Sequence, residues 1–232
     1  MSAVALVSAP GPGQLCGEQA TSVALLSIQG VPLAVHAIRG LRSSGCVGHS
    51  VIIAPSTDAE ALRSVLADWE LSATVVPASA DLGDSVRLAM DAALARMPDA
   101  GVVLVHELIR AFAPPDLVRS VVAEAERGAR AVVPVLPLVD TIKRVDHEGR
   151  VIGTPDRSSL RVPQTPVGFP VDALGSALRG GPISGLLDLL DRTGPPTSVP
   201  GHPDAMRIST PFDITVAEAM LSDRHTPSET PS

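Results

Sequence analysis

The 232-residue chain has few aromatic and few cysteine side chains. Aromatic residues make up 2% of it, with no Tyr, so its core must be built from Val, Leu, Ile and Ala. That composition suits buried parallel strands covered by helices. The two cysteines, Cys16 and Cys46, are too few for a disulfide framework or a four-cysteine zinc site. We expect them to be ordinary thiols in a reducing cytoplasm.

Excess positive charge and long apolar runs are also missing. The formal net charge is -7, which argues against a general affinity for nucleic acid or an anionic membrane. No apolar run approaches the roughly 18 residues of a membrane span. The N-terminal residues lack the basic start and the apolar length of a signal peptide. The sequence therefore predicts a cytoplasmic protein with no membrane or nucleic-acid partner.

Apolar β-branched runs alternate with helical patterns along the first 139 residues. Strands are expected at 3–8, 50–55, 73–77, 101–107 and 129–139, and helices at 32–45, 57–69, 84–97 and 114–128. This alternation predicts an α/β fold with a doubly wound, mostly parallel sheet. Ligands of such sheets bind beyond the carboxyl ends of the strands. The candidate segments are then 9–20, 78–85, 106–110 and 140–143.

The pattern changes after residue 139. Two short alternating stretches flank a "DHEG" turn, which predicts a β-hairpin arm over 139–158. Such a hairpin buries little by itself, so we expect it to pack on something else, such as a second subunit. Residues 222–232 are polar and rich in Pro, Ser and Thr, which predicts a disordered tail after a single domain over 1–221.

The stretch "VSAPGPGQLCGEQATSVALLSIQG" has the outline of a phosphate-binding turn without its charge. A short apolar strand leads into a Gly-rich loop, yet the first cationic side chain of the chain is Arg39. The glycine spacing departs from G-x-G-x-x-G by one residue, and Pro12 removes a backbone N–H. A phosphate cradle and a plain strand-to-helix loop both remain open on this pattern.

His106 and Glu107 end a buried strand, and Arg110 follows by three residues. Ionisable groups at that position are candidates for an active site, or for a buried pair that its neighbours satisfy. The remaining histidines show no metal-ligand spacing with Cys or carboxylates, and G-x-S-x-G does not occur.

Two segments carry a family resemblance: "VLVHELIRAF" (103–112) and "VVPVLPLVDTIKRVDHEGRVIGTPDRSSLRVPQTPVGF" (132–169). They resemble the 2-C-methyl-D-erythritol 4-phosphate cytidylyltransferase family, in which they read "VLVHDAARP" and "PV.DTIK…R…L…QTPQ.F". A weaker likeness extends over residues 3 to about 221. The resemblance implies a Rossmann-like nucleotidyltransferase fold and a homodimer whose hairpin arm covers the partner's active site. It also implies the joining of CMP from CTP to methylerythritol phosphate, with Mg²⁺ and loss of pyrophosphate.

Several of the family's functional positions are kept. Gly11 and Gly13 match the loop glycines, and Ser85 matches a nucleotide-binding serine. On the substrate side, the matching residues are Arg110, Thr141, Arg157 and Thr165, of which Arg157 matches an Arg lent by the partner's arm. Arg207 stands at the position of a C-terminal Lys that lies near the triphosphate in the family. The resemblance therefore implies that Arg207 is a catalytic cation.

Other positions depart from the family. Gln14 stands at the position of an Arg in the family's Gly-rich loop. Ser22 and Val23 stand at the positions of a Pro-Lys pair that follows in the family. Leu82 replaces an Arg, and residues 184–186 replace Thr-Asp-(Asp/Glu). Glu107 replaces the strand-end Asp that lies near metal and phosphates, so it is only a weak candidate for a metal ligand.

These losses fall on the triphosphate side, so we expect weak or absent cytidylyltransferase activity and weak binding of CTP or another nucleotide. A small phosphorylated substrate remains a possible ligand, and Mg²⁺ is expected only if the chain is active. The alternatives are an active enzyme with relocated cations, and a binding or regulatory homodimer, including one that pairs with an active paralogue.

Overall fold

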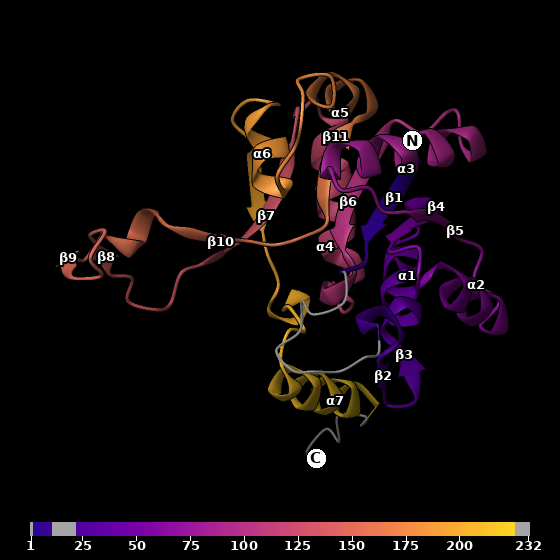
Figure 1. Cartoon of the computed structure of the whole chain (residues 1–232), viewed down its shortest axis with the longest axis horizontal. Helices are drawn as coiled ribbons and strands as arrows, with labels where there is room; N and C mark the ends of the chain where they lie inside the picture. The colour runs from indigo at the N-terminus through magenta and orange to yellow at the C-terminus, as the bar shows by residue number, and fades with distance from the viewer. Residues whose placement is uncertain (1, 11–21, 226–232) are drawn as a thin grey trace, which may run out of the picture.

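The computed structural model describes residues 2–10 and 22–225. Within them an eight-stranded sheet has the order β10-β7-β11-β6-β1-β4-β5, with β12 also paired to β7 (Figure 1). The strands of this sheet are β1 (Ala3–Ser8), β4 (Val47–Ala54), β5 (Thr74–Pro77), β6 (Val102–Glu107), β7 (Val132–Pro137), β10 (Arg161–Pro163), β11 (Val167–Pro170) and β12 (Thr197–Pro200). Strands β6, β1, β4 and β5 are mutually parallel, whereas β11 is antiparallel to β6 and β7, and β10 is antiparallel to β7.

Helices cover both faces of the sheet, so the predicted doubly wound α/β class is confirmed. The helices are α1 (Leu33–Ser43), α2 (Ala59–Asp68), α3 (Leu82–Arg96), α4 (Pro115–Glu126), α5 (Val171–Ala177), α6 (Leu186–Asp191) and α7 (Pro211–His225). The five strands and four helices expected in residues 3–139 all form, with ends displaced by up to three residues.

The apolar core consists mainly of two clusters, one on each face of β1. The residues of β1 alternate between these faces, as the period of a strand requires. Val7 packs with apolar residues of α1, α2 and α4, and Leu6 packs with those of α3, α5 and α6. Because both faces are covered, β1 is apolar from Ala3 to Val7 rather than alternating in polarity.

The segment after β7 projects from the body of the molecule (Figure 1). At its far end β8 (Arg144–Val145) and β9 (Val151–Gly153) pair antiparallel around a turn in which Gly149 has φ +80. Asp146 closes that turn by accepting the backbone N–H groups of Glu148 and Arg150. A short hairpin of β8 and β9 therefore lies within the expected residues 139–158, while the role of this segment as an arm that contacts a second subunit stays a prediction.

The expected tail boundary at residue 222 is wrong. Helix α7 continues to His225, and its last turns are tied to the turn between β2 (Ser27–Ile28) and β3 (Val31–Pro32). Gln29 Nε2 donates to the Glu218 carbonyl and to Ser222 Oγ, each at 2.9 Å. The rest of the expected tail, 226–232, and the Gly-rich loop, 11–21, lie outside the described residues.

None of the helices in residues 2–10 and 22–225 has the length and apolar character needed to cross a bilayer.

Candidate functional site

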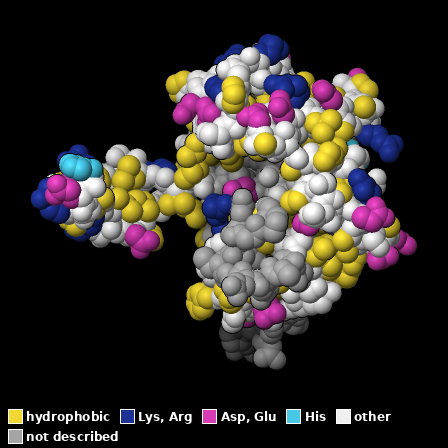
Figure 2. All heavy atoms as spheres, viewed as in Figure 1, with side chains coloured by type: hydrophobic (Ala, Val, Ile, Leu, Met, Phe, Trp, Pro, Cys, Tyr) yellow, Lys and Arg dark blue, Asp and Glu magenta, His cyan; other side chains and the backbone are white. Residues whose placement is uncertain are grey.

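A pocket of about 460 Å³ opens at the carboxyl end of β6. Its polar lining comes from four segments: the end of β6 with the 3₁₀ turn η2 (Leu108–Arg110), the β10–β11 connection, the start of α6, and the chain after η4 (Pro203–Ala205). The charged or polar side chains that line it are Glu107, Arg110, Gln164, Thr165, Ser184, Asp188 and Arg207. The space-filling view is hollowed beside the base of the projecting segment, where acidic and basic side chains meet (Figure 2).

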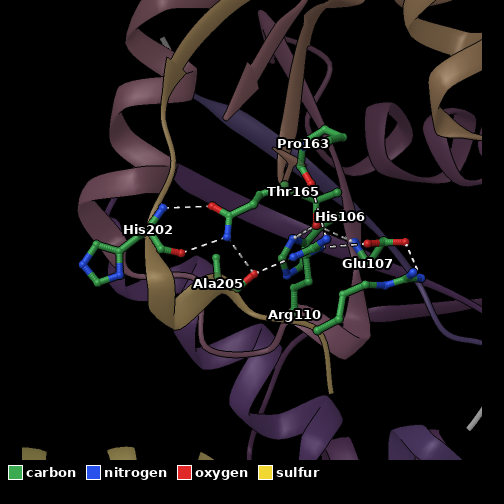
Figure 3. A network of polar contacts seen from close by, with 9 residues as sticks. His106, Glu107, Arg110, Pro163, Thr165, His202 and Ala205 are labelled. Atoms are coloured by element: carbon green, nitrogen blue, oxygen red, sulfur yellow. Dashed lines mark hydrogen bonds and ion pairs between the residues drawn. The ribbon is translucent and has the colours of Figure 1, made fainter. Parts of the chain in front are cut away.

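Glu107 forms ion pairs with two arginines in this pocket. Arg110 Nε donates to Glu107 Oε2 at 2.9 Å, and Arg207 Nη2 donates to Glu107 Oε1 at 3.0 Å. Figure 3 shows Glu107 and Arg110 turned toward each other. Each carboxylate oxygen therefore has its own guanidinium, an arrangement in which Glu107 bridges two cations.

The two arginines differ strongly in burial. Arg110 is 8% exposed, and its guanidinium also donates to the backbone carbonyls of Ala205, at 2.7 Å, and Pro163. Burial lowers the pKa of the Arg110 guanidinium, and its hydrogen bond to Glu107 opposes that change. Arg207 has a side chain 53% exposed. Arg110 thus joins three chain segments, whereas Arg207 is the cation that an incoming ligand can reach.

His106, the residue before Glu107, is buried next to these ion pairs. Its Nδ1 lies 3.0 Å from Thr165 Oγ1, which also accepts the Glu107 backbone N–H at 3.1 Å (Figure 3). Burial lowers the pKa of His106 to about 3, and the positive charge of Arg110 acts in the same direction. The imidazole is therefore neutral at ordinary pH. Of the two interpretations left open for the strand end, the buried group satisfied by its neighbours fits His106. Glu107 is partly exposed and lines the pocket, so its role as an active-site residue stays a prediction.

Gln164 is a site residue that our sequence reasoning missed. Its buried amide donates to the His202 carbonyl at 2.9 Å and the Ala205 carbonyl at 3.2 Å, and it accepts the His202 backbone N–H at 2.8 Å. These bonds hold η4, and with it the segment that carries Arg207, against the β10–β11 connection. The signal was present in the "QTP" motif, of which only Thr165 was singled out.

The structure brings four of the expected site residues together. Glu107, Arg110, Thr165 and Arg207 all line the pocket. Ser85 is buried in α3, and its hydroxyl accepts the Ser79 backbone N–H at 2.8 Å, so that oxygen is engaged within the chain. Gly11, Gly13 and Gln14 lie outside the described residues. Direct contact of any of these residues with a nucleotide stays a prediction.

Thr141 and Arg157 lie on the projecting segment and do not line the pocket of their own chain. Arg157 begins η3 (Arg157–Ser159) and donates to the Val139 carbonyl. Because their own pocket is out of reach, a substrate role for these two residues requires the site of another subunit.

The positions at which the family has a loop Lys and a second Arg are apolar here and packed inward. Val23, in the 3₁₀ turn η1 (Val23–Leu25), is 4% exposed, and Leu82 packs against the apolar core of α3. Arg39, the first cation of the sequence, lies over the Trp69 ring, with its guanidinium carbon 4.6 Å from the ring centroid. It is engaged on the α1–α2 side of the fold and does not line the pocket.

Glu107 does not fit the role of a divalent-cation ligand. Within the described residues no group of three or more His, Cys, Asp or Glu could hold a metal ion. Both Glu107 oxygens face guanidiniums, and the pocket's other carboxylate, Asp188, accepts the Ser184 backbone N–H and pairs with Arg192. A Mg²⁺ ion prefers oxygen ligands without nearby cations, so the weak metal-ligand expectation for Glu107 is not supported by this geometry.

Comparisons with known proteins identify close relatives. The model of the family described as 2-C-methyl-D-erythritol 4-phosphate cytidylyltransferase matches residues 3–223. Proteins of that name from Saccharopolyspora erythraea and Nocardia farcinica are 48% and 42% identical over 225 residues, covering 96% of this chain and 100% and 95% of theirs. The crystal structure of the Thermus thermophilus protein of that name is 25% identical, with a TM-score of 0.71, and the match covers 96% of this chain and 100% of that one. The crystal structure of 4-diphosphocytidyl-2C-methyl-D-erythritol synthase from Anaerococcus prevotii shares the fold, with a TM-score of 0.78 at 20% identity, covering 95% of this chain and 98% of that one.

Proposed function

The chain belongs to the 2-C-methyl-D-erythritol 4-phosphate cytidylyltransferase family, and from that premise we propose a member whose cytidylyl transfer is weak or absent. It keeps the side of the pocket that takes methylerythritol phosphate, through Arg110 and Thr165, and it binds CTP weakly. The distribution of cations carries this proposal, because both guanidiniums lining the pocket, Arg110 and Arg207, lie on one side of it and are tied to Glu107.

The Gly-rich loop supplies no cationic side chain. Residues 11–22 contain Glu18 and neither Lys nor Arg. Val23, at the position of the family's loop Lys, packs in the core. A triphosphate needs charge compensation from both ends, since phosphoryl transfer depends chiefly on positioning and on stabilising charge on the phosphate oxygens.

The size of the expected loss follows from the missing contacts. One preorganised donor to developing charge is typically worth about 10² to 10³ in rate. Two missing cations, even when their effects are less than additive, correspond to roughly 10⁴ in rate, or about 5 kcal/mol. For ground-state binding, each missing charge-assisted hydrogen bond costs about 1.5–3 kcal/mol. Any Mg²⁺ requirement would then come from the nucleotide's phosphates rather than from Glu107.

A second candidate function is the family's own reaction at an ordinary rate. The relative from Saccharopolyspora erythraea, named as the cytidylyltransferase, is 48% identical and is matched over its whole length, which favours this alternative. It requires that the triphosphate be held by cations from elsewhere. Arg39 is a poor source, because its guanidinium lies over Trp69. Arg192, which pairs with Asp188 at the pocket wall, is one other source, and a second subunit is another.

We also propose that the chain acts as a homodimer through residues 139–158. The projecting segment exposes large apolar side chains to solvent, among them Val139, Val145, Val151 and Ile152. Figure 2 shows hydrophobic side chains along the projection. An intersubunit contact would bury them and would carry Thr141 and Arg157 to the partner's pocket. A binding or regulatory dimer, including one with an active paralogue, uses the same contact, and a cytoplasmic location stays an expectation from the sequence.

Pyrophosphate release tests the proposed function. The purified chain is incubated with CTP, methylerythritol phosphate and Mg²⁺, with the Thermus thermophilus enzyme as the positive control. We expect a kcat/KM at least about 10³ below that of the control, since two donors are missing. A rate within tenfold of the control would refute the proposal and favour the second candidate. An Arg207→Gln variant of this chain is the matched control, because any residual activity of the site should fall further with it.

A further inference from the structure

We propose that Glu107 is the internal counter-anion of a two-arginine anion site, and that a phosphate group binds there by displacing Glu107 from Arg207. The carboxylate then competes with the ligand and sets how strongly the site takes phosphate, instead of sharing a metal ion with it. This inference rests on the proposed function only in placing a phosphate group in this pocket.

The first support is the geometry of the bridge. One carboxylate oxygen faces Arg110 Nε at 2.9 Å, and the other faces Arg207 Nη2 at 3.0 Å. A phosphate group presents oxygens that pair with guanidinium N–H groups in the same way. The Glu107 carboxylate therefore lies between two guanidiniums, in a position where a phosphate group could make the same contacts.

The second support is the difference between the two ion pairs. Arg110 is buried and is also held by the Ala205 and Pro163 carbonyls, so its pair with Glu107 is fixed by three segments of the fold. Arg207 has Glu107 as its ion-pair partner and is half exposed. Exposed ion pairs contribute little to stability, so the Arg207 pair opens readily. A ligand can take Arg207 while Glu107 remains on Arg110.

The third support is side-chain length. Glu107 and Arg110 are three residues apart along the chain, whereas Arg207 arrives from a distant segment. An aspartate at position 107 would be shorter by about 1.5 Å, one carbon–carbon bond. From that distance it could not keep both contacts. The extra methylene is thus what allows this side chain to bridge the two arginines, and it distinguishes this chain from the family's strand-end Asp.

Local charge explains why an anion, and not a cation, is the fitting ligand. Glu107 supplies one negative charge against the two guanidiniums that it touches. Among the pocket residues that the structure describes, the other acidic group is Asp188, which is paired with Arg192. A divalent cation at Glu107 would meet two positive charges within a few ångströms, and an anion would be attracted by them.

Titration with inorganic phosphate in the presence of EDTA tests the proposal, with binding followed by calorimetry. Glu107→Gln removes the competing charge while keeping an oxygen that can accept from Arg110. We expect phosphate to bind this variant at least about tenfold more tightly than the parent chain, the equivalent of one charge-assisted hydrogen bond. The gain should disappear when Arg207→Gln is added. Unchanged or weaker binding by Glu107→Gln, or binding that requires Mg²⁺, would overturn the proposal.

A second variant keeps the test decisive if Glu107→Gln does not fold, which thermal unfolding would reveal. Glu107→Asp retains the charge but not the reach, so it should also bind phosphate more tightly than the parent in EDTA. If Glu107 were instead a metal ligand, Glu107→Asp would change binding only when Mg²⁺ is added. No nucleotide is present in these titrations, so their outcome is independent of the pyrophosphate-release assay. Rapid pyrophosphate release together with the expected phosphate result would refute the proposed function alone.

Discussion

His106 Nδ1 lies 3.0 Å from Thr165 Oγ1, and this contact joins the end of β6 to the connection that enters β11. His106 is 1% exposed. The same threonine oxygen accepts the Glu107 backbone N–H, so the contact fixes the backbone from which Glu107 projects. Because the ring is buried beside Arg110, a protonated imidazole is disfavoured there. The candidate site is thus built on a histidine that must stay neutral.

The first prediction concerns the pH dependence of folding. Burial lowers the pKa of His106 from its ordinary value of 6.5 to about 3 in the folded chain, so the unfolded chain binds more protons between these values. Stability is then complete above the unfolded pKa and is lost as the pH falls below it. Between about pH 7.5 and about pH 5 this amounts to about 2 kcal/mol.

Urea denaturation at a series of pH values, on the parent chain and on His106→Gln, measures this effect. Burial also lowers the pKa of His36 and of His49, so the informative quantity is the difference between the two proteins. The free energy of unfolding should depend less on pH in the variant. Parallel curves for the two proteins would show that His106 does not contribute.

The second prediction separates the two arginines that hold Glu107. Arg110→Gln removes a buried guanidinium that donates hydrogen bonds to Glu107 and to two backbone carbonyls. This change should lower the free energy of unfolding by about 3 kcal/mol. Arg207→Gln is the matched control. It breaks an exposed pair with the same carboxylate and should cost less than about 1 kcal/mol. Equal losses in chemical denaturation would contradict the structural role of Arg110.

Much of the sheet could be predicted from the sequence because its strands are buried on both faces. Runs such as residues 102–105 are apolar and mostly β-branched, and the helices between them carry one apolar face each. The elements after residue 158 were not predicted. Strand β10 has three residues and α6 has six, which is too short for a periodic signal. Their positions are set by long-range pairing with β7 and by packing on the core.

The residue types of the site could be predicted from the sequence, whereas the contacts between residues distant in the chain could not. Glu107 and Arg110 follow from the rule that parallel sheets bind ligands at the carboxyl ends of strands. The ion pair of Glu107 with Arg207, one hundred residues away, depends on the tertiary path of the chain and leaves no local pattern. The same holds for the inward direction of Val23, since a valine after a Gly-rich loop can equally face solvent or the core.

The third prediction tests the support beneath Arg207. A Cβ added at Gly201 would lie 2.4 Å from Gln164 Oε1 and 3.0 Å from the Val135 backbone, distances that require the chain to move. Gly201→Ala should therefore weaken the Gln164 contacts to His202 and lower the free energy of unfolding by about 1–3 kcal/mol. Gly185→Ala is the control, because nothing lies within 4 Å of its added Cβ. Chemical denaturation that ranks the two variants equally would contradict the close packing at Gly201.

The fourth prediction addresses the proposed homodimer. Val139 and Val151 are 77% and 63% exposed on the projecting segment, so changing both to Asp should leave the folded subunit intact. The charges should nevertheless prevent an apolar contact between subunits. Light scattering of the parent at micromolar concentration should give twice the 23.8 kDa chain mass, and the double variant should give one chain mass. Leu88→Asp, an exposed change on α3, is the control and should stay dimeric. A monomeric parent chain would rule out the proposed dimer.

The last prediction asks whether the uncharged loop limits activity. Val23→Lys alone should fail, because it places a charge where a 4% exposed side chain packs in the core. We expect that variant to lose about 3 kcal/mol of stability and to gain no activity. The charges and the backbone that presents them must come together, and in the family a proline precedes the lysine. We therefore replace residues 9–26 with the corresponding segment of the Thermus thermophilus enzyme.

The chimera should release pyrophosphate from CTP and methylerythritol phosphate at least about 10²-fold faster than the parent chain, the value of one restored donor. Recovery should be partial, since a displacement of about 1 Å in a catalytic group can cost about 10² in rate. Adding Glu107→Asp to the chimera tests whether the bridge to Arg207 also limits turnover, and we expect a further increase. Fast turnover by the parent chain would show that the loop charges are dispensable. A folded chimera that binds CTP but forms no product would place the defect in residues 184–186, where Ser184 now pairs with Asp188 at the far wall of the pocket.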